Sequence, residues 1–119
     1  MLAGALYERE HNRCVVSRVW KAASLWERAR GLLGRPPLAA GEGFLIEPCR
    51  MVHTFGMRYV LDLAFIDRQG RVCKLAYGVG PGRFAGAAAA HATLELATGA
   101  LAASGLKLGD TVAWRDQRP

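Results

Sequence analysis

The chain has 119 residues, of which 51% are hydrophobic and 22% charged, and this length and balance predict one globular domain spanning residues 1–119. The composition excludes a disordered chain, and no run of about 18 apolar residues is present that would span a bilayer. The net charge of +6 comes from scattered basic residues without aromatic–basic alternation, so we expect no dedicated nucleic-acid binding.

The first third of the chain predicts a strand followed by a helix. Residues 1–11 carry an apolar patch too short for a secretory signal, so the chain as written is predicted to be cytoplasmic. Residues 14–20 are β-branched and apolar, which favours a strand. Ser24 and Glu27 form a capping box at the start of an amphipathic helix that we expect to end at Gly34. Its apolar stripe consists of Leu25, Trp26, Ala29, Leu32 and Leu33.

The rest of the chain predicts short strands. Residues 59–66 are apolar on both faces, which is typical of a central strand, and Asp67 to Gly70 is a type I turn leading into an antiparallel return. Residues 99–104 predict a short helical turn. The other expected strands are residues 44–47, 71–77, 93–97 and 111–114. The predicted fold class is α+β, mainly β: a small bent antiparallel-rich sheet or partial barrel with one amphipathic helix near the N-terminus.

The sequence predicts no metal and no cofactor. Cys49 and His53 are four residues apart, but no further pair completes a metal shell. The glycine-rich segment 78–83 lacks the pattern of a phosphate-binding loop and is interpreted as a connector. Cys14, Cys49 and Cys73 are too widely spaced for a disulfide framework, and we expect all three as small buried hydrophobic residues.

Asp62 is the most informative single residue, because a carboxylate in the middle of a doubly apolar strand is costly to bury without partners. One interpretation is a structural tie to backbone N–H groups or to a neighbour such as His53 or Arg50. Another makes Asp62 the floor of a pocket or the group that orients His53 as a general base. A third leaves it exposed at a sheet edge. Thr54 and Cys49 are near in sequence, but neither lies in a recognisable nucleophile motif.

Two further charged residues are candidates for a site. Glu95 is flanked by Leu94 and Leu96, and in an alternating strand it is expected to face water more readily than to serve a function. Arg83 follows the glycine-rich segment, from which its side chain would reach an anion if that segment closed over a pocket.

Six blocks in fixed order carry a resemblance to a known family. They are residues 27–35, 43–45, 53–67, 81–83, 94–99 and 105–110. Together they resemble, over about residues 18–114, the prokaryotic family known as domain of unknown function 192. The resemblance implies a compact β-rich fold, brings no activity or cofactor, and implies relatives that are often exported. It makes six residues the site candidates: His53, Thr54, Met57, Asp62, Arg83 and Glu95.

Three functions stay open at this point. The first and favoured one is a non-enzymatic ligand- or protein-binding accessory domain, with a partner in envelope or pilus assembly as the resemblance implies; it predicts an exposed apolar patch or groove. The second is a small hydrolase that uses His53 with Asp62 in an open cleft. The third is a basic anion- or nucleic-acid-binding domain, which requires the arginines to gather on one face.

Overall fold

The computed structural model describes residues 1–117, so the last two residues of the predicted domain lie outside the described part. In chain order the elements are β1 (Leu2–Glu8), β2 (Arg13–Lys21), α1 (Leu25–Arg30), β3 (Glu42–Ile46), β4 (Met51–His53), β5 (Leu61–Ile66), β6 (Val72–Val79), β7 (Phe84–Gly86), β8 (Ala92–Ala97), α2 (Ala100–Ser104) and β9 (Val112–Asp116). Strands dominate and both helices are short, which confirms the predicted α+β, mainly β class.

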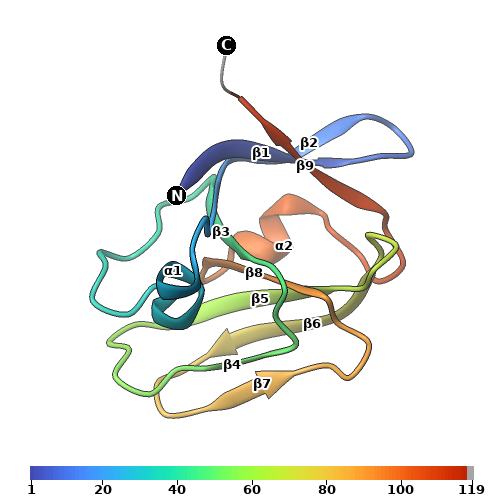
Figure 1. The fold of residues 1–119 in the computed structure, drawn as a ribbon. Helices are drawn as coiled ribbons and strands as arrows, with labels where there is room; N and C mark the ends of the chain where they lie inside the picture. Colours follow the sequence, from blue (N-terminus) through green and yellow to red (C-terminus); the bar gives the residue numbers. More distant parts are fainter. Residues whose placement is uncertain (118–119) are drawn as a thin grey trace.

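One mixed, seven-stranded sheet forms the body of the molecule, in the order β6-β5-β8-β3-β2-β1-β9. Every neighbouring pair is antiparallel except β2 and β3, which are parallel. The sheet bends around α2, so that β1 and β9 lie above this helix and β5 and β8 lie below it (Figure 1). A bridge from Arg71 to Thr111 joins the two edges at one point, but the sheet is not closed into a barrel.

The central strand β5 divides the interior into two apolar layers. All six residues of β5 are buried, as the two-sided apolar pattern predicts. Ala64 and Ile66 face the layer that contains Leu101 of α2. The alternate side chains of β5 face a second layer, which also holds Leu32 and is covered by a two-stranded ribbon of β4 and β7. The candidate site lies in this second layer.

The helix α1 differs from the prediction in length and in what it buries. Half of its capping box is present: Ser24 Oγ accepts from Glu27 N–H at 3.1 Å, but the Glu27 carboxylate accepts from the N–H of Ala23, one residue before the N-cap, at 2.7 Å. The helix ends at Arg30, because Gly31 takes a positive φ of 55°. Leu25 and Trp26 lie outside the core, at 76% and 72% exposure, and Ala29 and Leu33 are also exposed. The predicted stripe is therefore wrong for all of its members except Leu32, which is buried.

The strands β1, β4 and β7 were not predicted, and the element nearest to the N-terminus is a strand, not the expected helix, which follows at residues 25–30. The chain opens with two strands, and β1 pairs with both β2 and β9. The expectation of three buried cysteines is also wrong, since Cys14 is exposed on β2 and Cys49 and Cys73 are half-buried. Neither described helix has the length and apolar character to cross a bilayer.

Gly4 of β1 is expected to be intolerant of any side chain. A Cβ at this position would lie 2.4 Å from the carbonyl oxygen of Arg115 and 2.5 Å from Cε2 of the Trp114 ring. The ring cannot easily move away, because its Nε1 donates to Val19 O at 2.9 Å. We expect Gly4→Ala to lower the free energy of unfolding by about 1–3 kcal/mol, the usual cost of overpacking, measured by urea unfolding.

The matched control for this substitution is Gly80→Ala, where an added Cβ meets no atom within 4 Å. That variant is expected to unfold within about 0.5 kcal/mol of the parent chain. Equal effects at the two positions would show that the β1–β9 contact does not limit the size of the residue at position 4.

Candidate functional site

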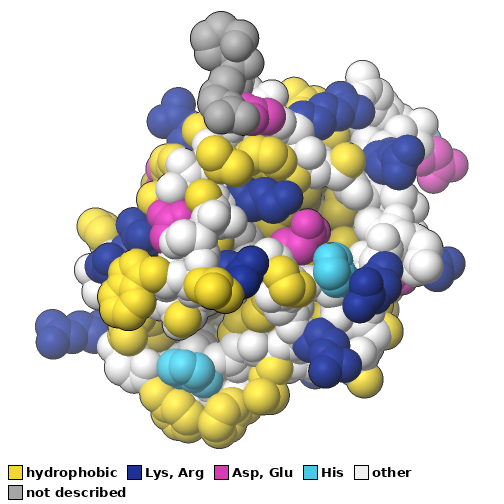
Figure 2. Space-filling view, viewed as in Figure 1, with side chains coloured by type: hydrophobic (Ala, Val, Ile, Leu, Met, Phe, Trp, Pro, Cys, Tyr) yellow, Lys and Arg dark blue, Asp and Glu magenta, His cyan; other side chains and the backbone are white. Residues whose placement is uncertain are grey.

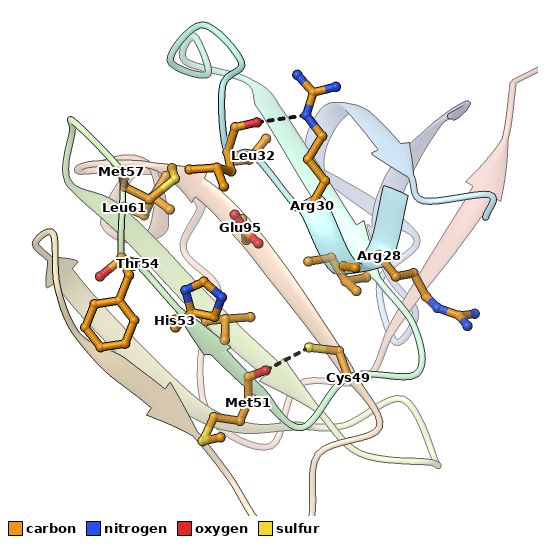
Figure 3. Close-up of a pocket in the computed structure, with 16 residues that line it drawn as sticks. Arg28, Arg30, Leu32, Cys49, Met51, His53, Thr54, Met57, Leu61 and Glu95 are labelled. Atoms are coloured by element: carbon orange, nitrogen blue, oxygen red, sulfur yellow. Dashed lines mark hydrogen bonds between the residues drawn. The ribbon is translucent and has the colours of Figure 1, made fainter. Parts of the chain in front are cut away.

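A cavity of about 230 Å³ lies between α1, the β4 end of the ribbon and the face of β8 and β5. Residues from α1 and the turn after it form one wall, and the segment around β4 forms the other (Figure 3). Four of the six predicted site residues line it: His53, Thr54, Met57 and Glu95. Asp62 and Arg83 do not line it.

Glu95 forms the floor of this cavity. It lies on β8 directly across from Phe44 of β3 and Leu63 of β5, so its carboxyl shares a face with two buried apolar side chains. Only 5% of the residue is exposed, and the expectation that alternation turns Glu95 toward open water is wrong. Figure 3 shows the carboxyl in the middle of the site, between Leu32 and His53 in that view.

The carboxyl of Glu95 has no hydrogen-bond or ion-pair partner within residues 1–117. Every side-chain oxygen or nitrogen that is fully buried in the described chain has a hydrogen-bond partner. Since the oxygens of Glu95 have none, they are not fully buried, and solvent contacts them through the cavity. Burial raises the pKa of the Glu95 carboxyl to about 7. A buried acceptor without a donor is unusual in native proteins and requires an explanation.

The wall formed by the turn after α1 covers Glu95 closely. A Cβ on Gly31 would lie 3.4 Å from Oε1 of Glu95, an ordinary contact distance, so this turn lies directly beside the carboxyl. Tyr59 fixes this turn: its hydroxyl is 3.5 Å from the carbonyl oxygen of Leu32 and 3.4 Å from that of Arg35. Burial first, and the charge of Glu95 second, raise the pKa of Tyr59.

The opposite wall carries exposed aromatic side chains. The rings of His53, Phe55 and Phe84 form one cluster, with centroids 4.9 Å apart for the two phenylalanines and 5.5 Å apart for His53 and Phe55. Both phenylalanines are exposed, and so is Met51 at the start of β4. Figure 2 shows hydrophobic side chains gathered beside a histidine at the lower edge of this face, where Figure 1 places the ribbon.

Thr54 holds the glycine-rich segment against this ribbon. Its hydroxyl donates to Gly80 O at 2.6 Å and accepts from Arg83 N–H at 2.8 Å, while its own N–H donates to Arg83 O at 2.8 Å. The Arg83 side chain is exposed, so the residue takes part here through its backbone. These bonds explain why Thr54 is buried although it lies in a polar loop.

Asp62 is a structural tie on the other side of the sheet. It is 2% exposed, and its two oxygens accept from Gly78 N–H at 2.9 Å and from Leu101 N–H at 3.1 Å. The second bond joins β5 to the first turn of α2, on the face opposite to the cavity. His53 is exposed on β4 and lines the cavity, so the structure does not bring the two residues together in one cleft.

One cluster of acidic and histidine side chains lies away from the cavity. Glu8, Glu10 and His11 are the three described residues whose ligand atoms fall within 4.8 Å of one another. The Glu8 carboxylate already accepts from the backbone N–H of His11 and contacts the His11 ring. These contacts are those of an ordinary turn. None of the three lines the cavity around Glu95.

The chain matches a protein family and is similar to two solved structures. The family model described as "DUF192: Uncharacterized ACR" matches residues 7–114, which confirms the resemblance read from the motifs. A protein of unknown function from Novosphingobium aromaticivorans DSM 12444 is 25% identical, with a TM-score of 0.74 over 94% of this chain and 84% of that one. A "putative transcription regulator" from Sinorhizobium meliloti 1021 is 21% identical, with a TM-score of 0.78 over 95% and 92%. No curated protein matches.

Proposed function

The chain belongs to the DUF192 family of uncharacterised proteins, and we propose that it is a non-enzymatic binding domain whose ligand site is the cavity around Glu95. The observation that carries this proposal is the unpartnered carboxyl on an otherwise apolar floor. Such a group destabilises the free protein, and a ligand that supplies the missing donor would offset that cost.

The surroundings of the cavity support binding. Leu33, Met51 and Phe55 line its mouth and are exposed, although large apolar side chains are normally drawn into the core. Exposed apolar residues gathered around a concave polar group are typical of an interaction site.

The hydrolase alternative is less well supported by the same contacts. Asp62 is occupied by two backbone N–H groups, so it does not orient His53. The two candidate nucleophiles of the cavity are also engaged: Thr54 Oγ1 donates to Gly80 O, and Cys49 Sγ donates to Met51 O at 3.4 Å. General base catalysis requires a base and a nucleophile in mutual reach, and these residues do not supply that pair.

Thermal unfolding against a panel of peptides, sugars, nucleotides, phosphate esters and divalent metals tests this proposal. A ligand at a hundred times its dissociation constant adds about 2.7 kcal/mol, which raises Tm by several degrees. We expect a positive shift to disappear in Ala29→Trp, because Ala29 lines the cavity from the exposed side of α1 and an indole there fills the mouth.

The matched control is Ala103→Trp, which adds the same ring to an exposed alanine of the other helix, α2. The shift should survive in that variant. A ligand whose stabilisation is retained in Ala29→Trp binds elsewhere and contradicts the proposed site.

A further inference from the structure

We propose that the cavity receives the side chain of a lysine or arginine from a partner polypeptide, with the Glu95 carboxylate as its counter-ion. This inference rests on the proposed function, because it assumes that the cavity is the ligand site. It adds the chemical class of the ligand and the kind of molecule that carries it.

The size of the cavity favours a single side chain over a large ligand. Sites for drug-sized molecules and cofactors measure roughly 300–1,000 Å³, whereas this cavity measures about 230 Å³. The space therefore suits one long amino-acid side chain better than a nucleotide or a flavin.

The lining of the cavity is complementary to an alkyl chain that ends in a cation. Leu32, Ile46 and Leu61 supply apolar walls, and Glu95 supplies a charge at the floor. Lysine and arginine pack their methylene stems on apolar surface and direct the charged end to a polar partner. A hydrogen bond between an ammonium or guanidinium group and a carboxylate is about twice as strong as one between neutral groups.

Residues 1–117 do not provide the cation. Arg28 and Arg30 line the cavity from α1, but Figure 3 shows both guanidinium groups directed away from Glu95, and Arg30 Nε donates to Leu33 O at 2.9 Å. The Tyr59 hydroxyl faces the carbonyl oxygens of the turn after α1, and His53 is exposed on the opposite wall. The elements that pack on Glu95 from the sheet, β3 and β5, present apolar residues.

The mouth of the cavity favours a polypeptide over a free amine. Exposed Leu33, Met51 and Phe55 surround the opening, and the Phe84 ring extends the apolar surface beyond it. Residues of a polypeptide on either side of the inserted side chain would cover this surface and exclude water from the charge pair. A free amine would leave it exposed.

Peptide pools provide a direct test. Immobilised seven-residue pools, acetylated and amidated, each carry one fixed residue at the centre and a mixture of Ala, Leu, Phe, Ser and Gly around it. Binding of fluorescently labelled protein is measured for all twenty pools at pH 8. We expect the Lys and Arg pools to bind at least tenfold more tightly than the Met and Gln pools, on the order of one charge-assisted hydrogen bond. The net charge of +6 favours the acidic pools, so non-specific attraction would give the opposite order.

Glu95→Gln is the critical variant, because it keeps the shape of the side chain and removes its charge. Truncating one partner of a buried charge pair costs about 2 kcal/mol or more, so the Lys and Arg pools should weaken at least about 30-fold. Binding of the Lys pool should also be about tenfold tighter at pH 8 than at pH 6, because the carboxylate must be ionised. This dependence should persist in His53→Asn and vanish in Glu95→Gln.

The outcomes separate the inference from the proposed function. Equal binding of Lys, Met and Glu pools, or unchanged binding of the Lys pool by Glu95→Gln, overturns the cationic ligand. Binding of n-butylamine as tight as that of the Lys pool overturns the polypeptide partner. If no peptide pool binds, but the thermal shift from a panel compound is lost in Ala29→Trp, the cavity is a site for a ligand of another class. Binding of the Lys pool that Ala29→Trp leaves intact overturns the site itself.

Discussion

Replacing Asp62 with alanine is expected to lower the free energy of unfolding by about 2–4 kcal/mol, because it leaves the buried N–H of Leu101 and the part-buried N–H of Gly78 without an acceptor. Both carboxylate oxygens are used, by Gly78 N–H at the end of β6 and by Leu101 N–H in α2. Water cannot easily replace the acceptor at Leu101, which is fully buried, whereas it can reach the exposed Gly78. Urea unfolding at pH 7, followed by circular dichroism, measures the loss.

Two comparison variants make this prediction specific. Asp62→Asn keeps one oxygen and turns an amide NH₂ toward the other donor, so an intermediate loss is expected. Asp110→Ala also removes an acceptor of a backbone N–H, that of Lys107 at 2.9 Å, but in an exposed turn where water can replace it. Its cost should be about 1 kcal/mol or less. A loss for Asp62→Ala no greater than that for Asp110→Ala would mean that the tie to α2 does not stabilise the fold.

The two buried carboxylates of the sheet differ in their hydrogen bonds, and this difference underlies the separate roles that we propose for them. Asp62 and Glu95 lie on neighbouring central strands, and both interrupt apolar runs. Asp62 is satisfied within the protein, which is the arrangement of a structural residue. Glu95 lines a cavity and has no donor within residues 1–117, which is the arrangement that our proposal of a ligand site requires. The sequence motifs single out both residues and do not distinguish these roles.

The central strands could be predicted from sequence because their signal is local. The two-sided apolar pattern of residues 59–66 predicts burial on both faces, and all six residues of β5 are buried. The turn at Asp67 is also local: Gly70 N–H donates to Asp67 O at 3.0 Å. The sequence predicts that Asp62 accepts bonds from some backbone N–H groups, because a buried carboxylate needs donors. It does not identify the donor in α2, which is 39 residues away in the chain.

The cavity could not be predicted because distant segments form it. Alternation along residues 93–97 suggests an open face for Glu95, but the turn after α1 and the segment around β4 cover that face. The helix was predicted too long because nothing in its apolar stripe reveals the positive φ of Gly31. The strands β4 and β7 have three residues each, and their pairing is continued by the bond from Thr54 N–H to Arg83 O, between segments that lie far apart in the chain. Strands of three residues are too short to show the alternation of apolar and polar residues by which a strand is predicted from sequence.

Glu95→Gln is expected to stabilise the free protein at neutral and alkaline pH. The pKa of Glu95 is raised from 4.5 to about 7 by burial, so between these values the folded state holds a proton that the unfolded state has lost. The free energy of unfolding then falls by about 1.4 kcal/mol per pH unit between pH 4.5 and pH 7. Above pH 7 it stays lower by the sum of that decrease. Removing the carboxyl should raise the free energy of unfolding by up to about 3 kcal/mol at pH 8 and by little at pH 4.

The measurement is urea unfolding of the parent chain and of Glu95→Gln from pH 4 to pH 9, with Glu10→Gln as the control at an exposed position. The difference between parent and Glu95→Gln should open above pH 4.5 and level off above pH 7, whereas the Glu10→Gln curve should run parallel to that of the parent. A pH-independent difference would show that Glu95 is not held neutral by burial. Because a gain in stability together with a loss of peptide binding cannot result from misfolding, this variant separates a carboxyl kept for a ligand from one kept for the fold.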